Sequence, residues 1–147
     1  MRKVLPPTYF FAAIALCFAL HFLFPVHQLL GFPWRLLGLV PLAIGIILNL
    51  VSDQMFKKHN TTVKPFQRSS VLITDGVFRL TRNPMYLGMT LILLGVALVL
   101  GSATPFAVAL LLGLLFDRLF IVQEERMLKN IFPEQFRQYC RRVRRWI

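Results

Sequence analysis

Two short stretches hold the residues whose types and spacing could do chemistry. In the first, "TRNPMYLG", Arg82 stands before Asn83 and Pro84, and Tyr86 follows two residues later. Asparagine is favoured as a helix N-cap and proline at the first helical position, so a helix is predicted to begin here. The start of a helix offers free N–H groups and a partial positive charge. With Arg82 beside it, this helix end suits an anion.

The second stretch, "DRLFIVQEERMLKNIF", contains Glu124 and Glu125, the adjacent acid pair of the chain. Asp117 and Glu124 are seven residues apart and are predicted to share one helix face. A solvated helix end would explain these acids equally well. If the helices of the two stretches run antiparallel with a short turn, the polar groups around Arg82 face the acids.

A site with anion-binding groups on one side and acids on the other suits a ligand that carries both charges. S-adenosylmethionine fits, because it combines a carboxylate, ribose hydroxyls and a sulfonium that is attracted to aromatic faces and acids. From the residues alone it is one candidate among several, and a lipid headgroup is another. The spacing of Cys17, Cys140 and the three histidines predicts no metal site and no disulfide.

The elements that must position these stretches are apolar helices. The chain has 147 residues, 56% of them hydrophobic, with a mean hydropathy of +0.63, which indicates a single membrane domain over 1–147. A membrane-spanning helix needs about 20 apolar residues. Four segments approach this length, and they predict an all-α bundle with four transmembrane helices: 8–30, 34–56, 84–100 and 104–122.

The first two of these segments are predicted to form an N-terminal helical hairpin over 8–56, with its turn at Pro25, Gly31 and Pro33. We read the first segment as a retained span and not a signal peptide. The hairpin has few polar groups and is assigned mainly to packing. The catalytic region is predicted to occupy 57–147. His21, inside the first span, is expected to hydrogen-bond to a neighbouring helix as a neutral side chain.

Positive charge is distributed unevenly along the chain, whose formal net charge is +11. The connection between the second and third spans and the tail after the fourth are rich in Lys and Arg, whereas the first turn has Arg35 and the turn "GSAT" has no basic residue. Basic connections stay in the cytoplasm, so both termini are predicted to be cytoplasmic, in a bacterial inner membrane. The charge indicates attraction to anionic lipid, and nucleic acid is not expected as a partner.

The segments around the site are polar or amphipathic. Residues 57–70 are predicted to form a loop, and "VLITDGVF" a turning segment, because Asp-Gly is a turn signal. The tail is predicted to form an amphipathic cytoplasmic helix with its apolar stripe on the membrane surface. That stripe consists of Leu128, Ile131, Phe132, Phe136, Tyr139 and Val143. Gly88 and Gly95 share one face of the third helix, where they serve either helix packing or close approach of a ligand.

Both stretches resemble one family of enzymes. "LITDGVFRLTRNPMYLG", followed by Gly95, resembles the pattern L-V-T-x-G-x-[YF]-x-x-x-R-[HN]-P-x-Y-x-G of membrane methyltransferases related to isoprenylcysteine carboxyl methyltransferase and phospholipid methyltransferases. The tail "EERMLKNIFPEQFRQYCRRVRRW" is similar to the family's E-E-x-x-L-x-x-x-F-[GP]-x-x-[YF]-x-x-Y-x-x-x-V-x-R. The resemblance covers roughly residues 60–146, and both blocks occur in the family order.

This resemblance implies methyl transfer from S-adenosylmethionine to a lipophilic substrate that enters from the bilayer. It implies that Glu124, Tyr139 and Arg145 line or close the catalytic site. The family's cofactor-binding positions correspond to Arg82, Asn83, Pro84, Tyr86, Gly88, Gly95, Glu124 and Glu125. No oligomeric state is predicted.

Two residues depart from the carboxyl methyltransferase branch. Asn83 stands where that branch has histidine, so an acid–base role near neutral pH is lost there. Phe120 stands where that branch has an arginine that could hold a substrate carboxylate. The methyl acceptor is therefore left open among a carboxylate, a phospholipid amine and a thiol. The alternative from another class is a non-catalytic membrane protein that binds anionic lipid or a partner helix.

Overall fold

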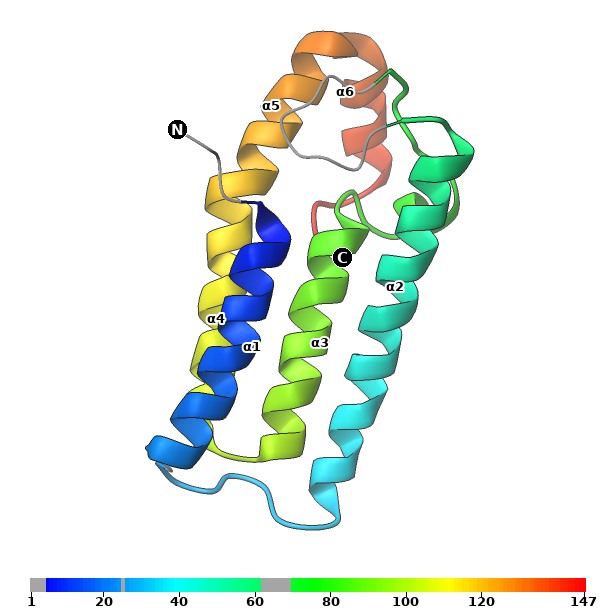
Figure 1. The fold of residues 1–147 in the computed structure, drawn as a ribbon. Helices are drawn as coiled ribbons and strands as arrows, with labels where there is room; N and C mark the ends of the chain where they lie inside the picture. Colours follow the sequence, from blue (N-terminus) through cyan, green and yellow to red (C-terminus); the bar gives the residue numbers. More distant parts are fainter. Residues whose placement is uncertain (1–4, 25, 62–69) are drawn as a thin grey trace.

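The computed structural model describes residues 5–24, 26–61 and 70–147, and these fold into helices (Figure 1). Within these ranges no strand forms, which confirms the predicted all-α class. The helices are α1 (Pro6–Leu23), α2 (Leu39–Lys58), α3 (Pro84–Leu100), α4 (Ala103–Phe116), α5 (Val122–Ile131) and α6 (Pro133–Arg142). Three short segments complete them: η1 (Trp34–Gly38), η2 (Gly76–Arg79) and the π-helical η3 (Asp117–Ile121).

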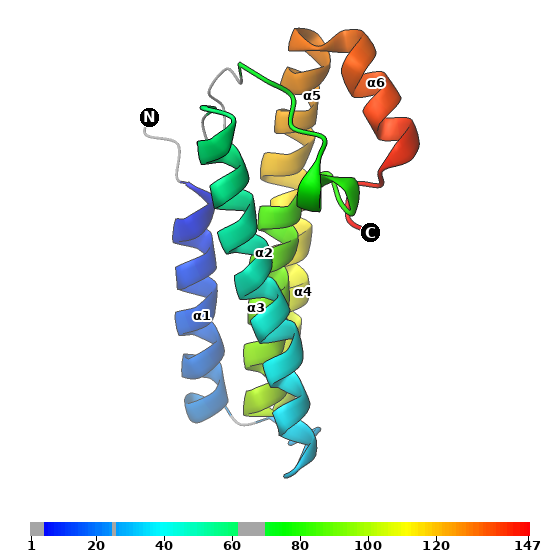
Figure 2. The ribbon, with the colours of Figure 1, turned by 90° about the vertical axis from the view of Figure 1, so that its right-hand side faces the viewer.

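The long helices are arranged around α3. Helix α2 packs along α3, and α1 packs mainly against α4, so α1 and α2 flank α3 in Figure 1. Figure 2 shows α5 and α6 at the end of the bundle where α2 ends and α3 begins. The two helices of the predicted N-terminal hairpin therefore pack mainly on the second half of the chain. The division at residue 57 stays a prediction.

Within the described ranges, three helices are long and apolar enough to cross a membrane: Pro6–Leu23, Trp34–Lys58 and Ala103–Ile131. Helix α3 is apolar but has only 17 residues, and its bounds are those predicted from the sequence. Helix α1 ends at Leu23, not at residue 30 as expected. The residue before a proline is driven out of the helical region, and Phe24, which precedes Pro25, has φ −135° and ψ 71°.

The predicted loop over 57–70 begins later than expected, because α2 continues to Lys58, and residues 62–69 of this prediction lie outside the described ranges. Lys57 and Lys58 lie in its last turn, where positive charge is favoured by the helix dipole. The turn predicted from Asp75 and Gly76 is confirmed, since the Phe78 amide donates to Asp75 O and Gly76 has φ +55°. Several residues with a predicted charge or turn role also lie outside the described ranges: Arg2, Lys3, Pro25, Lys64 and Arg68.

The end of the bundle opposite α5 and α6 is closed by short turns. Helix α3 ends at Leu100 and is capped by Gly101, whose φ of +74° suits glycine, and the Leu29 amide donates to Gly101 O at 2.8 Å. His21 Nδ1 lies 2.8 Å from Ser102 Oγ at the start of α4, which confirms the expected hydrogen bond to a neighbouring helix. These contacts join the segment around α1 and its following turn to the turn between α3 and α4.

Glycines bring α2 and α3 into close contact. A Cβ atom added at Gly95 would lie 2.7 Å from Gly38 O, and one added at Gly38 would lie 2.6 Å from Gly95 O. Gly88 of α3 faces Gly45 of α2 in the same way, seven residues nearer the start of α3. Backbone atoms can approach this closely only where side chains are missing, as in small-residue packing of membrane helices.

The apolar stripe of the tail has a protein partner. A break at Phe132 separates α5 from α6, and Phe136, Tyr139 and Val143 are buried against Ile73 and Phe78. The expectation that these three side chains face the membrane surface is wrong. Residues 72–78, before α3, cover the apolar face of α6, which gives the tail a small core of its own.

Candidate functional site

The two stretches that could do chemistry meet in the structure. Tyr86, in the first turn of α3, donates its hydroxyl hydrogen to Glu124 Oε1 at 2.6 Å. Glu124 lies in α5, which continues α4 through η3 without a break in the helical backbone. The predicted convergence of the two inner helix ends is confirmed by this contact. Asn83 and Pro84 begin α3 as predicted, although the Asn83 side chain does not cap the helix.

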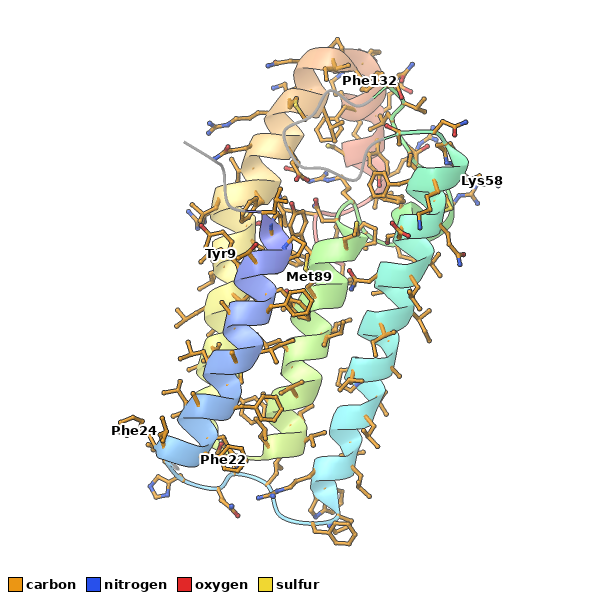
Figure 3. The ribbon with its side chains drawn as sticks, viewed as in Figure 1. Tyr9, Phe22, Phe24, Lys58, Met89 and Phe132 are labelled. Carbon is orange, nitrogen blue, oxygen red and sulfur yellow. The ribbon has the colours of Figure 1, made fainter. Side chains whose placement is uncertain are left out.

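A cavity of about 450 Å³ opens beside the Tyr86–Glu124 pair. Arg82 and Asn83 line its polar end together with Tyr86 and Glu124. The remaining walls are mostly apolar and come from α1, α2 and α3, including Phe10, Phe11, Phe56, Met85, Met89 and Ile92. Figure 3 labels Met89, which lies on α3 between the ribbons of α1 and α2 in this view. A mostly apolar cavity with a few convergent polar groups is the usual form of a small-molecule site.

An ion-pair network lies behind the polar end of the cavity. Arg82 contacts Glu125 Oε1 at 2.9 Å, and Arg145 contacts Glu125 Oε2 at 2.6 Å. Arg145 also reaches Asp117 at 3.2 Å, and the Trp146 indole donates to the same carboxylate. The side chains of Arg82 and Glu125 are 13% and 14% exposed, so each charge in this pair depends on its partner.

The π-helical segment η3 aligns the two acids of this network. In an unbroken α-helix Asp117 and Glu125, eight residues apart, would point about 80° away from each other. Both nevertheless contact Arg145. The wider turn of the π-helix takes up the difference. For the same reason Asp117 and Glu124 do not share a partner, contrary to the single face predicted from their spacing.

The C-terminal segment after α6 lies across the start of α3. The Arg82 amide donates to Arg144 O at 3.0 Å, and Thr81 Oγ1 donates to Arg145 O at 3.0 Å. Asn83 Nδ2 donates to the same carbonyl at 3.1 Å. Asn83 therefore lines the cavity and also binds the tail through its side-chain amide nitrogen. These bonds explain why the two sequence blocks occur together.

Tyr139 connects α6 with the cavity wall. Its hydroxyl donates to Phe78 O at 2.6 Å, and Phe78 lines the cavity. Burial raises the pKa of the Tyr139 phenol above its usual range, so the hydroxyl stays protonated and remains a donor. Hydrogen bonds to Glu125 likewise raise the pKa of the Arg145 guanidinium. Neither residue lines the cavity itself.

The predicted site residues therefore fall into three groups. Five line the cavity: Arg82, Asn83, Pro84, Tyr86 and Glu124. Three lie behind it and support its walls: Glu125, Tyr139 and Arg145. Gly88 and Gly95 face α2, which favours the packing role of the two that the sequence leaves open. Cofactor binding by these two glycines stays a prediction without geometric support.

Sequence reasoning missed the contribution of the N-terminal helices to the cavity. Phe10 and Phe11 of α1 and Asn49 and Phe56 of α2 line it, although both helices were assigned mainly to packing. Asn49 could have indicated this contribution, because an amide inside an apolar span usually has a specific role. Its Nδ2 atom donates to Gly45 O at 2.9 Å, which leaves the amide oxygen for other contacts.

Phe120 belongs to an aromatic cluster beside the cavity. Its ring is nearly parallel to that of Tyr86, with centroids 6.2 Å apart, and its edge contacts Tyr9 with centroids 5.6 Å apart. Phe116 packs against both Tyr86 and Phe120. At the position where the sequence pattern of carboxyl methyltransferases has a cation, this chain therefore has a buried aromatic ring.

A helical bundle with three spans of membrane length and a cavity near one end fits an integral membrane protein with a small-molecule site. Residues 34–135 match the model of a family described as phospholipid methyltransferase. Because this match covers more than half of the chain, the protein belongs to the phospholipid methyltransferase family.

Two relatives extend the comparison. The protein-S-isoprenylcysteine O-methyltransferase of Schizosaccharomyces pombe is 26% identical over 129 residues, which are 86% of this chain. An uncharacterized protein of Haemophilus influenzae is 35% identical over 63 residues, which are 43% of this chain and all of that protein. The chain spans 51% of the length of the Schizosaccharomyces pombe relative.

Proposed function

We propose that this protein transfers a methyl group from S-adenosylmethionine to a lipophilic substrate at the cytoplasmic face of a membrane. The observation that carries this proposal is the cavity in which Tyr86 and Glu124 meet, with a polar end and mostly apolar walls. Family membership supports methyl transfer, and so does the Schizosaccharomyces pombe relative, which is named as a methyltransferase.

The proposed arrangement has four transmembrane helices, α1 to α4, with both termini in the cytoplasm of a bacterium. Helix α3 is shorter than about 20 residues but is packed between longer neighbours, which reduces its exposure to lipid. The basic residues near α5, α6 and the end of α2 support a cytoplasmic position for the cavity. Helix α6 is then the cytoplasmic amphipathic helix.

The groups at the polar end fit the proposed cofactor. Glu124 offers a carboxylate that can accept hydrogen bonds from hydroxyl or amino groups, and the Tyr86 ring suits a sulfonium. The free N–H groups at the start of α3 suit a carboxylate, and Arg82, although paired with Glu125, adds positive charge beside them. When bound there, S-adenosylmethionine supplies the electrophilic methyl group.

The chain's own contribution would be positioning and exclusion of water. The aromatic and aliphatic walls keep the cavity dry, and the Tyr86–Glu124 hydrogen bond holds both side chains in one orientation. Pro84 and the tail fix the start of α3. Glu124 is placed to accept a proton if the methyl acceptor is an amine.

The acceptor that the site suits best is an amine or a thiol. Arg82, the cation among the described cavity-lining residues, is paired with Glu125, and Phe120 stands where the carboxyl methyltransferase pattern has an arginine that could hold a substrate carboxylate. The negative charge of Glu124 would repel the carboxylate of a substrate. An ethanolamine phospholipid or a thiol therefore fits better than an isoprenylcysteine carboxylate.

Isothermal titration with S-adenosylhomocysteine in detergent tests the cofactor proposal. We expect Glu124→Gln to weaken binding about 10- to 100-fold, the usual effect of losing a charged hydrogen-bond partner. Tyr86→Phe, which keeps the ring, should weaken it only a few-fold. Glu134→Gln serves as the control, because Glu134 is exposed on α6 and pairs with Arg137.

Absence of binding by folded wild-type protein would refute the proposal and favour a non-catalytic lipid-binding protein. A wild-type affinity in Glu124→Gln would remove Glu124 from the cofactor site. If binding is found, membranes incubated with methyl-labelled cofactor and then extracted will identify the acceptor, and label in ethanolamine lipids is the result expected for an amine acceptor.

A further inference from the structure

A second depression lies outside the cavity, between α6 and the segment that ends in η2. This basic groove has a volume of about 510 Å³, and its polar lining consists of Thr74, Arg79, Gln135, Gln138, Tyr139 and Arg142. The side chains of Thr74, Arg79, Gln135 and Arg142 can donate hydrogen bonds to a ligand in the groove. The Tyr139 hydroxyl already donates to Phe78 O, and the Gln138 amide donates to Glu134. None of the described residues that line the groove is acidic.

The arginines of the groove differ from those of the ion-pair network. Arg82 and Arg145 are paired with carboxylates, whereas the side chains of Arg79 and Arg142 form no hydrogen bond or ion pair with the part of the chain that the structure describes. Both are exposed at the groove. Two unneutralised guanidinium groups that line one groove with the Thr74 hydroxyl and the Gln135 amide suit a phosphate group, which arginine binds through several oxygens at once.

Apolar surface lies directly beside the groove. Leu80, next to Arg79 in the chain, is 70% exposed, and Val71 is 42% exposed. Basic residues next to exposed apolar side chains are typical of a surface that meets lipid headgroups and the start of the acyl chains. This combination favours the phosphate of an anionic phospholipid over a free phosphate ion.

We propose that the basic groove binds the phosphate of an anionic phospholipid headgroup. The groove shares a wall with the cavity: Tyr139 lines the groove and its hydroxyl binds Phe78 O, while Phe78 lines the cavity. A bound headgroup therefore joins α6 to η2 at the point where both support the cavity wall. The binding itself does not depend on methyl transfer.

Native mass spectrometry of the detergent-solubilised protein, titrated with phosphatidylglycerol or with phosphatidylcholine of the same acyl chains, tests this site. We expect tighter binding of phosphatidylglycerol, and a loss of about tenfold or more in the variant Arg79→Gln/Arg142→Gln, because each juxtamembrane cation contributes appreciably to anionic-lipid binding. The matched control, Arg126→Gln/Lys129→Gln, removes the same charge from exposed positions on α5 and should keep the wild-type affinity.

Three outcomes would overturn the proposal. The first is an unchanged affinity in the groove variant, and the second is an equal loss in both variants, which would indicate diffuse charge attraction. The third is displacement of the lipid by inorganic phosphate at equal concentration, which would assign the groove to the free anion. Far-ultraviolet circular dichroism of each variant checks that the helices are retained.

Discussion

Glu124 and Glu125 are neighbours in the sequence but belong to two different regions of the molecule. Glu124 lines the cavity and accepts a hydrogen bond from Tyr86. Glu125 points away from the cavity and is bound by both Arg82 and Arg145. The Glu124 carboxylate can therefore accept further hydrogen bonds from a ligand, whereas the Glu125 carboxylate is already bound by two arginines of the protein.

This difference separates two sets of residues. We call the residues that line the cavity its wall, and the interactions that hold this lining in place its frame. The frame consists of the ion-pair network, the glycine contacts between α2 and α3, and the Tyr139–Phe78 hydrogen bond. The acid pair that marks this sequence family thus contains one residue of each kind. Changes in the frame should lower stability, and changes in the wall should lower ligand affinity at constant stability.

The largest effect on stability is expected from Glu125→Gln. This change leaves Arg82, which is 13% exposed, without its charged partner, and it weakens the hold on Arg145. Removing one member of a largely buried ion pair costs about 3 kcal/mol. Chemical denaturation in detergent, followed by circular dichroism, measures the free energy of unfolding.

Glu124→Gln is the matched control, one residue away. We expect its free energy of unfolding to stay within about 1 kcal/mol of the wild type, since the hydrogen bond from Tyr86 can be kept by an amide oxygen. Equal destabilisation by the two changes would contradict the division between wall and frame.

Gly95→Ala should have an intermediate effect. The new methyl group would lie 2.7 Å from Gly38 O, and a backbone carbonyl cannot move aside without shifting α2. Overpacking of this kind costs about 1–3 kcal/mol. Thermal unfolding in detergent checks the loss, and Gly113→Ala is the control, because a methyl group there meets only ordinary contacts with Thr90 at 3.5 Å.

The ligand titration sharpens this result. If Gly95 only packs helices, the folded Gly95→Ala protein should bind S-adenosylhomocysteine with nearly the wild-type affinity. A selective loss of binding at normal stability would instead support the cofactor role that the sequence resemblance implies for this glycine.

The parts of the fold that local signals specify could be predicted from the sequence. Asn83–Pro84 and Gly101 set both ends of α3, because these residue types act within one helical turn. The meeting of Tyr86 with Glu124 followed from the short turn between α3 and α4. Hydrophobic periodicity also found the tail helices, although not the break at Phe132.

The features that depend on packing between distant segments could not be predicted. The partners of Asp117 require the π-helical turn, and the sequence pattern of an apolar helix does not reveal one extra residue per turn. The cavity walls from α1 require knowledge of which helix α1 packs against. The partner of the tail's apolar stripe was missed because Ile73 and Phe78 lie more than 50 positions before it.

The smallest effect is expected from Tyr139→Phe, which removes the hydroxyl that binds Phe78 O at 2.6 Å and keeps the ring in its core. The buried carbonyl loses its partner, at a cost of about 1 kcal/mol. Tyr9→Phe is the matched control, since the Tyr9 hydroxyl bonds to none of the described residues while its ring packs on Phe120. Thermal unfolding of the two variants measures the difference. Because Phe78 also lines the cavity, Tyr139→Phe should weaken S-adenosylhomocysteine binding slightly more than Tyr9→Phe does, and a larger loss of binding than of stability would move Tyr139 from the frame to the wall.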